Sequence, residues 1–270
     1  MRNAALHFAG LAMGTANTVR HRYRGYVNPR PFSAADVDRT IEHALEVVDR
    51  LQRHGAIDWT GLRVLEVGPG SDLSSGAVIK ARGAASYRAV DLFDNTGQAD
   101  PALYGEIGRR LGTPVDLAGL EFTLATFPAL PEVEGAYDMI VSNATLEHIE
   151  DVGGLFASLR RLAAPGARMA HHVDGQTHMR WIKDLDPLNI LRYSDQTYAR
   201  LLDFPGAPNR LRAEHYVQAA QASGWGDVAI IPDVRAEPGY LERTRLARRF
   251  RGATTLELLT FTLVASSPGP

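Results

Sequence analysis

Two glycines follow a short apolar run in the segment VLEVGPGSD and indicate a binding site for a nucleotide. The run includes Glu66, and Gly68 and Gly70 come soon after it. Glycines at the end of a strand let the backbone approach a ligand closely, and the helix that follows offers its N-terminal N–H groups. Asp91 lies 21 residues beyond Gly70, where a carboxylate can accept hydrogen bonds from both ribose hydroxyls. Together these residues predict a ligand that contains adenosine.

The same segment argues against a nicotinamide dinucleotide. The pattern is Gly68-x-Gly70-x-x-Leu73, so a leucine replaces the third glycine that lets a helix pack tightly beneath a pyrophosphate. Pro69 has no backbone N–H and cannot contribute to a phosphate cradle. A ligand with adenosine and no pyrophosphate fits better, and S-adenosylmethionine (SAM) meets that description. Nothing in the pattern explains Asp72.

A histidine follows the predicted fourth strand, in the segment TLEHIED. His148 could accept the proton of an attacking hydroxyl group, and a general base of this kind accelerates a reaction by about 10²–10⁴-fold. In the alternative, Glu147 and His148 only cap the next helix or face solvent.

More histidines follow the predicted fifth strand, in the segment HHVDGQTH. Side chains alternate along a strand, so His171 and His172 point to opposite faces and only one can reach a site from the strand. His171, Asp174 and His178 could converge if the chain turns directly after Asp174, and we take His171 as the second candidate base. Two histidines and an aspartate could bind a divalent metal ion, but no metal is expected. Otherwise these are hydrogen-bonded polar groups under a lid.

Alternating strand and helix patterns position these residues. Strands are predicted over 63–67, 86–91, 120–124, 137–142, 168–173, 226–232 and 255–265, and helices over 73–82, 101–111, 151–163, 212–223 and 239–250. The alternation predicts an α/β fold, a Rossmann-like, mostly parallel seven-stranded sheet with helices on both faces.

Two segments stand apart from this alternation. Residues 1–56 are expected to form an N-terminal helical arm or lid, before a SAM-binding domain over 57–270. The arm includes a helix that starts at the capping-box pair Ser33 and Asp36, packs on the sheet and stops at Gly55. Residues 174–211 are too long for a simple connection and are predicted to be a substrate-facing insert.

Candidate substrate contacts come from the insert and the arm, although core packing is the alternative for each aromatic side chain. The candidates are Asp174, His178, Trp181, Asn189, Tyr193, Tyr198 and Arg210 in the insert, and Tyr23, Tyr26 and Phe32 in the arm.

Four segments resemble the class I SAM-dependent methyltransferases in order and spacing. They are VLEVGPGSD, AVD, YDMIVSNATLEHIEDV and LRRLAAPGARMAHHVD, between about Leu62 and Val173. The resemblance implies an antiparallel last strand over 255–265. It also implies a cofactor site in which Glu66, Gly68 and Gly70 cradle the methionine part of SAM, while Asp91, with Leu92 beside it, holds the ribose.

The resemblance assigns three further residues to the cofactor site. Asn143 ends the fourth strand beside the sulfonium. Thr126 or Phe127 takes the place where many family members carry an acidic and a small residue near the adenine. The chain departs from the family pattern there.

The composition of the chain excludes several kinds of site and of binding partner. The chain has 270 residues, a net charge of −2 and no cysteine, which excludes disulfides, thiolate metal sites and a cysteine nucleophile. The charge argues against nucleic-acid binding, and no apolar run reaches the length of a membrane span. We expect a cytoplasmic protein with a small-molecule substrate and no nucleic-acid or membrane partner; a homodimer is an open alternative. The segment RTRLARRFR (243–251) is read as an amphipathic helix with Leu246 and Phe250 inward, or as a patch for an acidic ligand.

The predicted function is transfer of a methyl group from SAM to a small molecule, at a hydroxyl group of a sugar or secondary metabolite, with His148 or His171 as the base. The sequence Ser-Asn-Ala-Thr after the fourth strand lacks the Asn-Pro-Pro-Tyr pattern of amide and nucleobase nitrogen methylation. Transfer to carbon or nitrogen of a small molecule and a non-catalytic SAM-binding protein are the alternatives. An NAD(P)-dependent oxidoreductase ranks below them.

Overall fold

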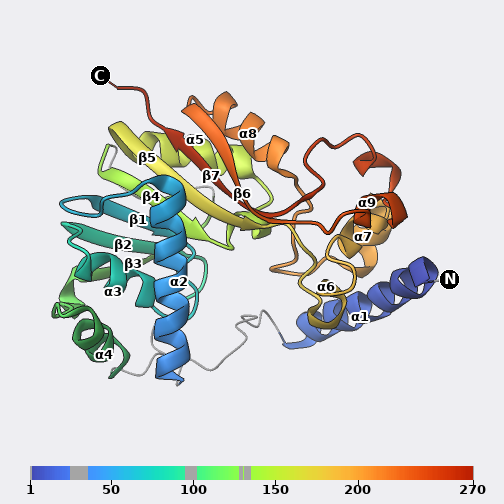
Figure 1. Ribbon diagram of the computed structural model, residues 1–270, viewed down its shortest axis with the longest axis horizontal. Coiled ribbons are helices and arrows are strands. Elements are labelled where there is room, and N and C mark those ends of the chain that lie inside the picture. The colour runs from blue at the N-terminus through green and yellow to red at the C-terminus, as the bar shows by residue number, and fades with distance from the viewer. Residues whose placement is uncertain (1, 25–35, 95–101, 128–129, 131–134, 270) are drawn as a thin grey trace.

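The computed structural model describes residues 2–24, 36–94, 102–127, 130 and 135–269. Its centre is a seven-stranded sheet with the order β3-β2-β1-β4-β5-β7-β6 (Figure 1). The strands are β1 (Arg63–Val67), β2 (Ser86–Asp91), β3 (Leu120–Leu124), β4 (Tyr137–Asn143), β5 (Ala163–Asp174), β6 (Gly226–Arg235) and β7 (Leu258–Ser266). Strands β1 to β5 pair in parallel, and β7 is antiparallel to both β5 and β6. This confirms the predicted sheet and its antiparallel last strand.

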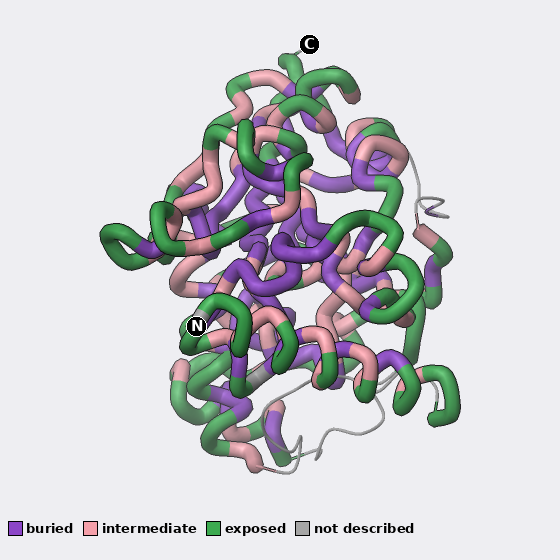
Figure 2. Tube along the Cα trace, turned by 90° about the vertical axis from the view of Figure 1, so that its right-hand side faces the viewer, coloured by how far each residue is buried: buried purple, intermediate pink, exposed green. Residues whose placement is uncertain are grey.

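Helices cover both faces of the sheet, as predicted (Figure 1). One layer consists of α2 (Val37–Gly55), α3 (Ser74–Ala81) and α4 (Ala102–Leu111), and the other of α5 (Val152–Leu162) and α8 (Ala213–Ala222). Side chains of β1 alternate between the layers, because Val64 packs in the core with α2 whereas Leu65 and Val67 pack in the core with α5. The buried residues accordingly run through the middle of the molecule (Figure 2).

The strand order reverses between β1 and β4. The chain moves outward from β1 through β2 to β3 and then returns to the other side of β1 at β4. In open α/β sheets, ligands bind at the carboxyl ends of the strands beside this reversal. The residues that follow β1, β2 and β4 are therefore the ones that can share a ligand.

Helix α2 begins later than the capping-box spacing predicted. Asp36 is its N-cap, and the carboxylate accepts a hydrogen bond from the backbone N–H of Arg39 at 3.3 Å. Ser33 lies outside the described residues. The helix ends at Gly55, as expected, and it packs on the sheet through residues such as Ile41 and Val48.

A third hydrophobic core, which we call the insert core, lies beyond the carboxyl ends of the strands (Figure 1). Three separate stretches build it. They are α1 (Arg2–Arg24); the segment after β5 with α6 (Arg180–Lys183), η4 (Asn189–Arg192) and α7 (Asp195–Leu201); and the β6–β7 connection with α9 (Tyr240–Arg243) and η5 (Arg248–Phe250). The sequence predicted the arm and the insert over 174–211. It did not predict that the β6–β7 connection joins them.

Helix α1 packs on the insert through a stripe of small residues. Gly10, Gly14 and Thr18 are its buried positions, one turn apart. A Cβ atom on Gly10 would lie 2.0 Å from Asn189 Oδ1, so only glycine permits this approach. Tyr193 Oη donates a hydrogen bond to the carbonyl of His7 at 2.8 Å, which fixes the N-terminal half of the helix to the insert.

The arginine-rich segment does not form the single helix predicted over 239–250. The chain makes the short helix α9, continues without regular structure, and then makes the 3₁₀ turn η5. Leu246 and Phe250 are nevertheless buried in the insert core, as expected, and the five arginines between 243 and 251 are exposed. Two buried apolar side chains are enough to attach the segment to the core, but they are too few to require a continuous helix.

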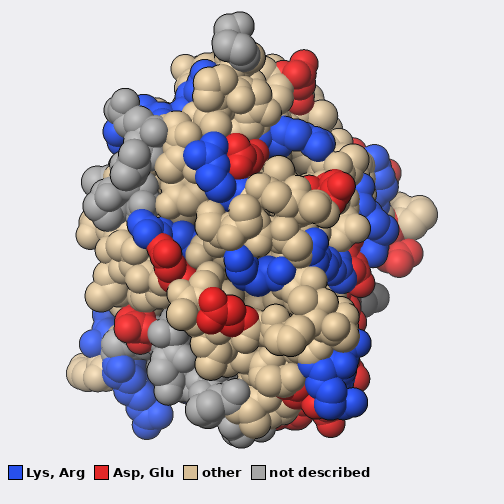
Figure 3. All heavy atoms as spheres, turned by 90° about the vertical axis from the view of Figure 1, so that its left-hand side faces the viewer, with Lys and Arg blue, Asp and Glu red and all other residues tan. Residues whose placement is uncertain are grey.

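Charges of both signs are interspersed over the face of the molecule shown in Figure 3. Within the described ranges, no helix combines the length and the apolar character needed to span a bilayer.

Candidate active site

The turn after β1 contacts the turn after β4. Gly68 has a φ of +72°, which glycine adopts without strain, and its N–H donates to the carbonyl of Val90 at 2.8 Å. A Cβ atom on Gly68 would lie 2.5 Å from both Oγ1 and Cγ2 of Thr145. The glycine therefore allows the two turns to touch at the point where the strand order reverses.

Asp91 faces this turn from the end of β2. Its carboxylate accepts a hydrogen bond from the N–H of Phe93 at 3.2 Å, and the N–H groups of Leu92 and Gly70 also point to it. Burial raises the pKa of Asp91, and these three backbone N–H groups oppose the rise. The structure thus brings Asp91 and Gly70 together. Its binding of a ribose stays a prediction.

Glu66 is buried beneath the same turn. Tyr87 Oη donates a hydrogen bond to Glu66 Oε2 at 2.5 Å. Burial raises the pKa of Glu66 to about 7, although the Tyr87 hydrogen bond lowers it. Asp72, which the sequence left unexplained, accepts a hydrogen bond from the N–H of Ser74 at 3.0 Å and so supports the start of α3.

The other residues assigned to the cofactor site lie at its margin. Leu92 and Thr126 are exposed, and Phe127 packs against the core that α5 covers. Asn143 is half-buried at the end of β4, and its Oδ1 accepts a hydrogen bond from Arg50 Nη1 at 3.3 Å.

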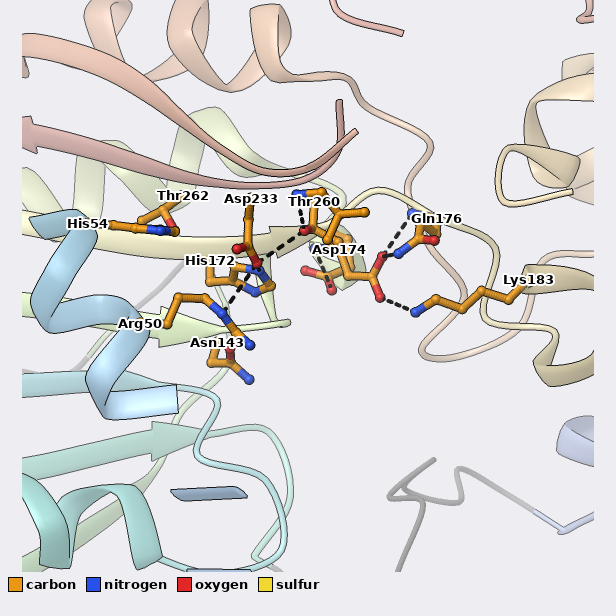
Figure 4. A network of polar contacts seen from close by, with 12 residues as sticks. Arg50, His54, Asn143, His172, Asp174, Gln176, Lys183, Asp233, Thr260 and Thr262 are labelled. Atoms are coloured by element: carbon orange, nitrogen blue, oxygen red, sulfur yellow. Dashed lines mark hydrogen bonds and ion pairs between the residues drawn. The ribbon is translucent and has the colours of Figure 1, made fainter. Parts of the chain in front are cut away.

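Sequence reasoning missed a polar network next to Asn143 (Figure 4). Arg50 Nε lies 3.3 Å from Asp233 Oδ2, and His172 Nε2 lies 3.2 Å from the same oxygen. These side chains come from α2, β6 and β5. Burial lowers the pKa of His172 to about 4. The one feature of the sequence that pointed to this network was the alternation along β5, which directs His171 and His172 to opposite faces of the sheet.

His171 points away from the network, as the alternation predicts. It is 0% exposed, its ring lies 6.0 Å from that of Phe156 on α5, and its Nδ1 is 2.8 Å from Ser142 Oγ. Burial lowers the pKa of His171 to about 3. A ring enclosed in this core argues against the predicted role of His171 as the base.

Glu147, His148 and His178 come together between β4 and the insert. One potential ligand atom from each lies within 4.8 Å of the other two, and the rings of His148 and His178 meet edge to face with centroids 4.9 Å apart. Burial, with the nearby His178, lowers the pKa of His148 to about 4. Glu147 does not cap the next helix, because Asp151 is the N-cap of α5.

This cluster differs from the set His171, Asp174 and His178 considered from the sequence. Asp174 is instead paired with Lys183, whose Nζ lies 2.6 Å from Asp174 Oδ2 (Figure 4). Burial alone would raise the pKa of Asp174, but Lys183 and His178 together bring it below its usual value.

A pocket of about 590 Å³, counting the space open to solvent, lies between α1 and the insert. Its walls are mainly apolar. The lining residues are Gly14, Asn17, His21, Thr177, His178, Met179, Ile190, Tyr198, Leu202, Phe204, Gly206 and Pro208. Two of the predicted substrate contacts, His178 and Tyr198, are among them.

Several other predicted substrate contacts lie elsewhere. Trp181 is 78% exposed, and Tyr23 is exposed near the end of α1. Tyr193 and Asn189 are buried against α1, where they bind its backbone carbonyls. Arg210 is buried, pairs with Asp195 and donates to the carbonyl of Tyr193 at 2.9 Å, so it holds the insert together. Tyr26 and Phe32 lie outside the described residues.

Comparison with known proteins agrees with the resemblance seen in the motifs. The model of the family described as "Methyltransferase domain" matches residues 37–230. A malonyl-[acyl-carrier protein] O-methyltransferase of Chlorobium phaeovibrioides is 36% identical over 127 residues, which are 47% of this chain and 45% of that protein. The chain spans about half the length of the curated relatives it matches.

Solved structures share the fold at low sequence identity. Phosphoethanolamine N-methyltransferase 2 of Haemonchus contortus, in complex with SAM, matches with a TM-score of 0.54 at 13% identity, over 91% of this chain and 61% of that one. A SAM-dependent methyltransferase of Mesorhizobium loti matches with a TM-score of 0.50 at 14% identity, over 83% and 97%.

Proposed function

Because the chain belongs to the methyltransferase domain family, we propose that it transfers the methyl group of its cofactor, SAM, to an oxygen atom of a small acceptor with an apolar body. The observation that carries the choice of acceptor is the pocket beside α1, whose walls are mainly apolar and which reaches His178. An apolar lining favours a secondary metabolite over a sugar.

The residues after β1, β2 and β4 fit SAM. Gly68 and Gly70 have positive φ and carry no side chain, so a ligand can approach their backbone closely. Asp91 presents a carboxylate across the turn to the ribose, and Glu66 supplies a second carboxylate for the amino group of the methionine part. When bound, SAM supplies a methyl group on a positively charged sulfur, which is a good leaving group.

His148 and His178 would act on the acceptor. His178 lines the pocket, so an acceptor hydroxyl at this end of the pocket would meet its ring, and His148 lies directly against His178. The lowered pKa values keep both imidazoles neutral near pH 7, the state that can accept a proton. The apolar walls and α1 would hold the acceptor in position for the transfer.

A second candidate acceptor is the carboxyl group of a malonyl thioester on an acidic carrier protein. The name of the Chlorobium relative and the exposed arginines between 243 and 251 favour it. A carboxylate is already ionised near pH 7, so its methylation would need no histidine base.

The test is methyl transfer from isotopically labelled SAM to a panel of apolar metabolites with hydroxyl groups, and to malonyl carrier protein, with products identified by mass spectrometry. Transfer to a hydroxyl supports the proposal, and transfer to the malonyl carboxyl alone supports the second candidate. Absence of SAM binding by calorimetry would overturn both.

A variant separates binding from turnover. We expect His178→Gln to lower kcat for a hydroxyl acceptor while the Kd for SAM stays unchanged. His43→Gln, an exposed position on α2, is the matched control. Unchanged kcat in His178→Gln would remove this histidine from the mechanism.

A further inference from the structure

We propose that Glu147, His148 and His178 bind a divalent transition-metal ion at the inner end of the pocket. The chain offers one ligand atom from each residue, and these atoms lie within 4.8 Å of one another. Ligand atoms around a metal ion at about 2.0–2.2 Å are separated by roughly 3–4 Å. Small side-chain rotations therefore suffice to close the site.

Glu147 and His148 are each held by one polar atom, and each has a second polar atom that is buried without a partner in the described part of the chain. Glu147 Oε1 accepts a hydrogen bond from the N–H of Asp174 at 3.2 Å, while Oε2 is buried and finds no hydrogen-bond partner among the described residues. His148 donates to the carbonyls of Gly206 and Ala207, while its buried Nδ1 has no partner within that same set.

His178 is also held by one ring nitrogen, because it donates to the backbone carbonyl of Asp174. In protein metal sites, a ligating histidine typically donates its other N–H to a carbonyl or carboxylate, which fixes the ring and directs the free nitrogen to the metal. Asp174 thus orients two of the three ligands through its backbone N–H and C=O. Its side chain is engaged with Lys183 at 2.6 Å and is not needed at the site.

Because these polar atoms are buried and have no partner among the residues described, a bound cation would stabilise them. Glu147 is 1% exposed, and a buried polar atom without a partner destabilises the fold. The nearest ammonium group, that of Lys183, is already paired with Asp174. A single ion would satisfy Glu147 Oε2 and His148 Nδ1 together, with a ring nitrogen of His178 as the third ligand.

The ligand set selects the class of ion. Imidazole suits Fe²⁺ and Zn²⁺, and a carboxylate suits Mn²⁺, whereas Mg²⁺ and Ca²⁺ prefer oxygen ligands alone. Two histidines and one carboxylate leave coordination positions open. Because His178 lines the pocket, an open position would face the acceptor.

The role of the ion rests on the proposed function. An ion that binds the acceptor hydroxyl lowers its pKa, as a bound metal does for water. The O–H bond breaks and the proton leaves to solvent; the oxygen then forms a bond to the methyl carbon as the carbon–sulfur bond breaks. His148 then acts as a ligand and not as the proton acceptor.

Metal binding is tested directly on the full chain, without a polyhistidine tag and stripped of metals. Calorimetry with MnCl₂ and with ZnCl₂ should show one equivalent bound. Glu147→Gln and His178→Gln should each weaken binding by at least tenfold, whereas His43→Gln should not. Affinity for S-adenosylhomocysteine, measured on every variant, shows that the fold is intact.

The outcomes separate this inference from the proposed function. The metal site would be overturned if the wild type binds neither Mn²⁺ nor Zn²⁺, or if the wild type and both site variants bind the ion equally well. Methyl transfer to a hydroxyl acceptor that continues unchanged in the stripped protein with EDTA would overturn the role of the ion and leave the proposed function standing. Stoichiometric binding without transfer to any hydroxyl would support the site and count against the proposed function.

Discussion

At the residue scale, a substitution of Asp91 tests the cofactor site most directly. Its carboxylate lies across the turn from Gly70 and is fixed by backbone N–H groups, so it can accept hydrogen bonds from a ribose without rearrangement.

We expect Asp91→Ala to weaken binding of S-adenosylhomocysteine by ~1–3 kcal/mol, because two ribose hydroxyls lose their acceptor. Calorimetry measures the change, with Asp184→Ala, an exposed position on the insert, as the control. Equal affinity in wild type and Asp91→Ala would place the ribose elsewhere.

Glu66 gives the fold a pH dependence of defined sign. Burial raises its pKa from 4.5 to about 7, so the folded chain binds a proton more tightly than the unfolded chain. Stability should therefore fall as pH rises from about 4.5 to 7 and then level off, by at most about 3 kcal/mol from this group.

The Glu66→Gln variant has no carboxyl group to titrate at this position. As pH rises from about 4.5 to 7, the unfolding free energy of the wild type should therefore fall relative to that of Glu66→Gln. Urea unfolding at a series of pH values measures it. A constant difference would show that Glu66 titrates alike in the folded and unfolded chain.

At the element scale, strands were predicted better than their connections. The bounds of β1, β2 and β3 agree with the prediction. For β1 the reason is that a central strand of a parallel sheet is a buried apolar run, and this one ends directly before Gly68. The turn after β1 and its relation to Asp91 were predictable for the same reason, since parallel strands end at one edge.

The acceptor side was not predictable in this way. His178 meets His148 only because the chain after β5 returns towards β4, and no period in the sequence records that return. The choice between His171 and His172 depends on which face of the sheet the network occupies, and that depends on Arg50 and Asp233 from distant elements.

The insert depends on one buried carboxylate. Asp186 accepts hydrogen bonds from Arg192 Nε at 2.6 Å, from Asn189 Nδ2 at 2.7 Å and from Tyr240 Oη at 2.5 Å. These partners come from η4 and α9, so Asp186 ties the segment after β5 to the β6–β7 connection.

Asp186→Ala should destabilise the insert by about 3–5 kcal/mol, because it leaves the buried Arg192 guanidinium unpaired. Hydrogen exchange should show the loss of protection in η4 and α9 before the sheet. Asp203→Ala, exposed on the same insert, serves as the control. Intact protection in Asp186→Ala would mean that packing alone holds these elements.

At the scale of the whole molecule, α1 closes the pocket on the side away from the sheet. Gly14 lines the pocket, and a Cβ atom there would lie 2.2 Å from Leu202 Cδ2. Displacing α1 should therefore affect the acceptor and not the cofactor.

We expect Gly14→Val to raise KM for a hydroxyl acceptor by about tenfold, equivalent to about 1.4 kcal/mol, with SAM affinity unchanged. Steady-state kinetics checks it against Ala12→Val, which places the same residue type on the exposed face of α1. A parallel loss of SAM affinity would show that α1 supports the entire site.

The insert core also has a consequence for the order of folding. Asn189 binds the carbonyl of Leu6, 183 residues away along the chain, and Tyr240 joins the same core later still. During synthesis α1 must wait, without its partners, while β1 to β5 and their helices emerge and assemble. In a nascent chain, the turns after β1, β2 and β4 would therefore form before the acceptor pocket. A chain at this stage could bind SAM before it has a pocket for the acceptor.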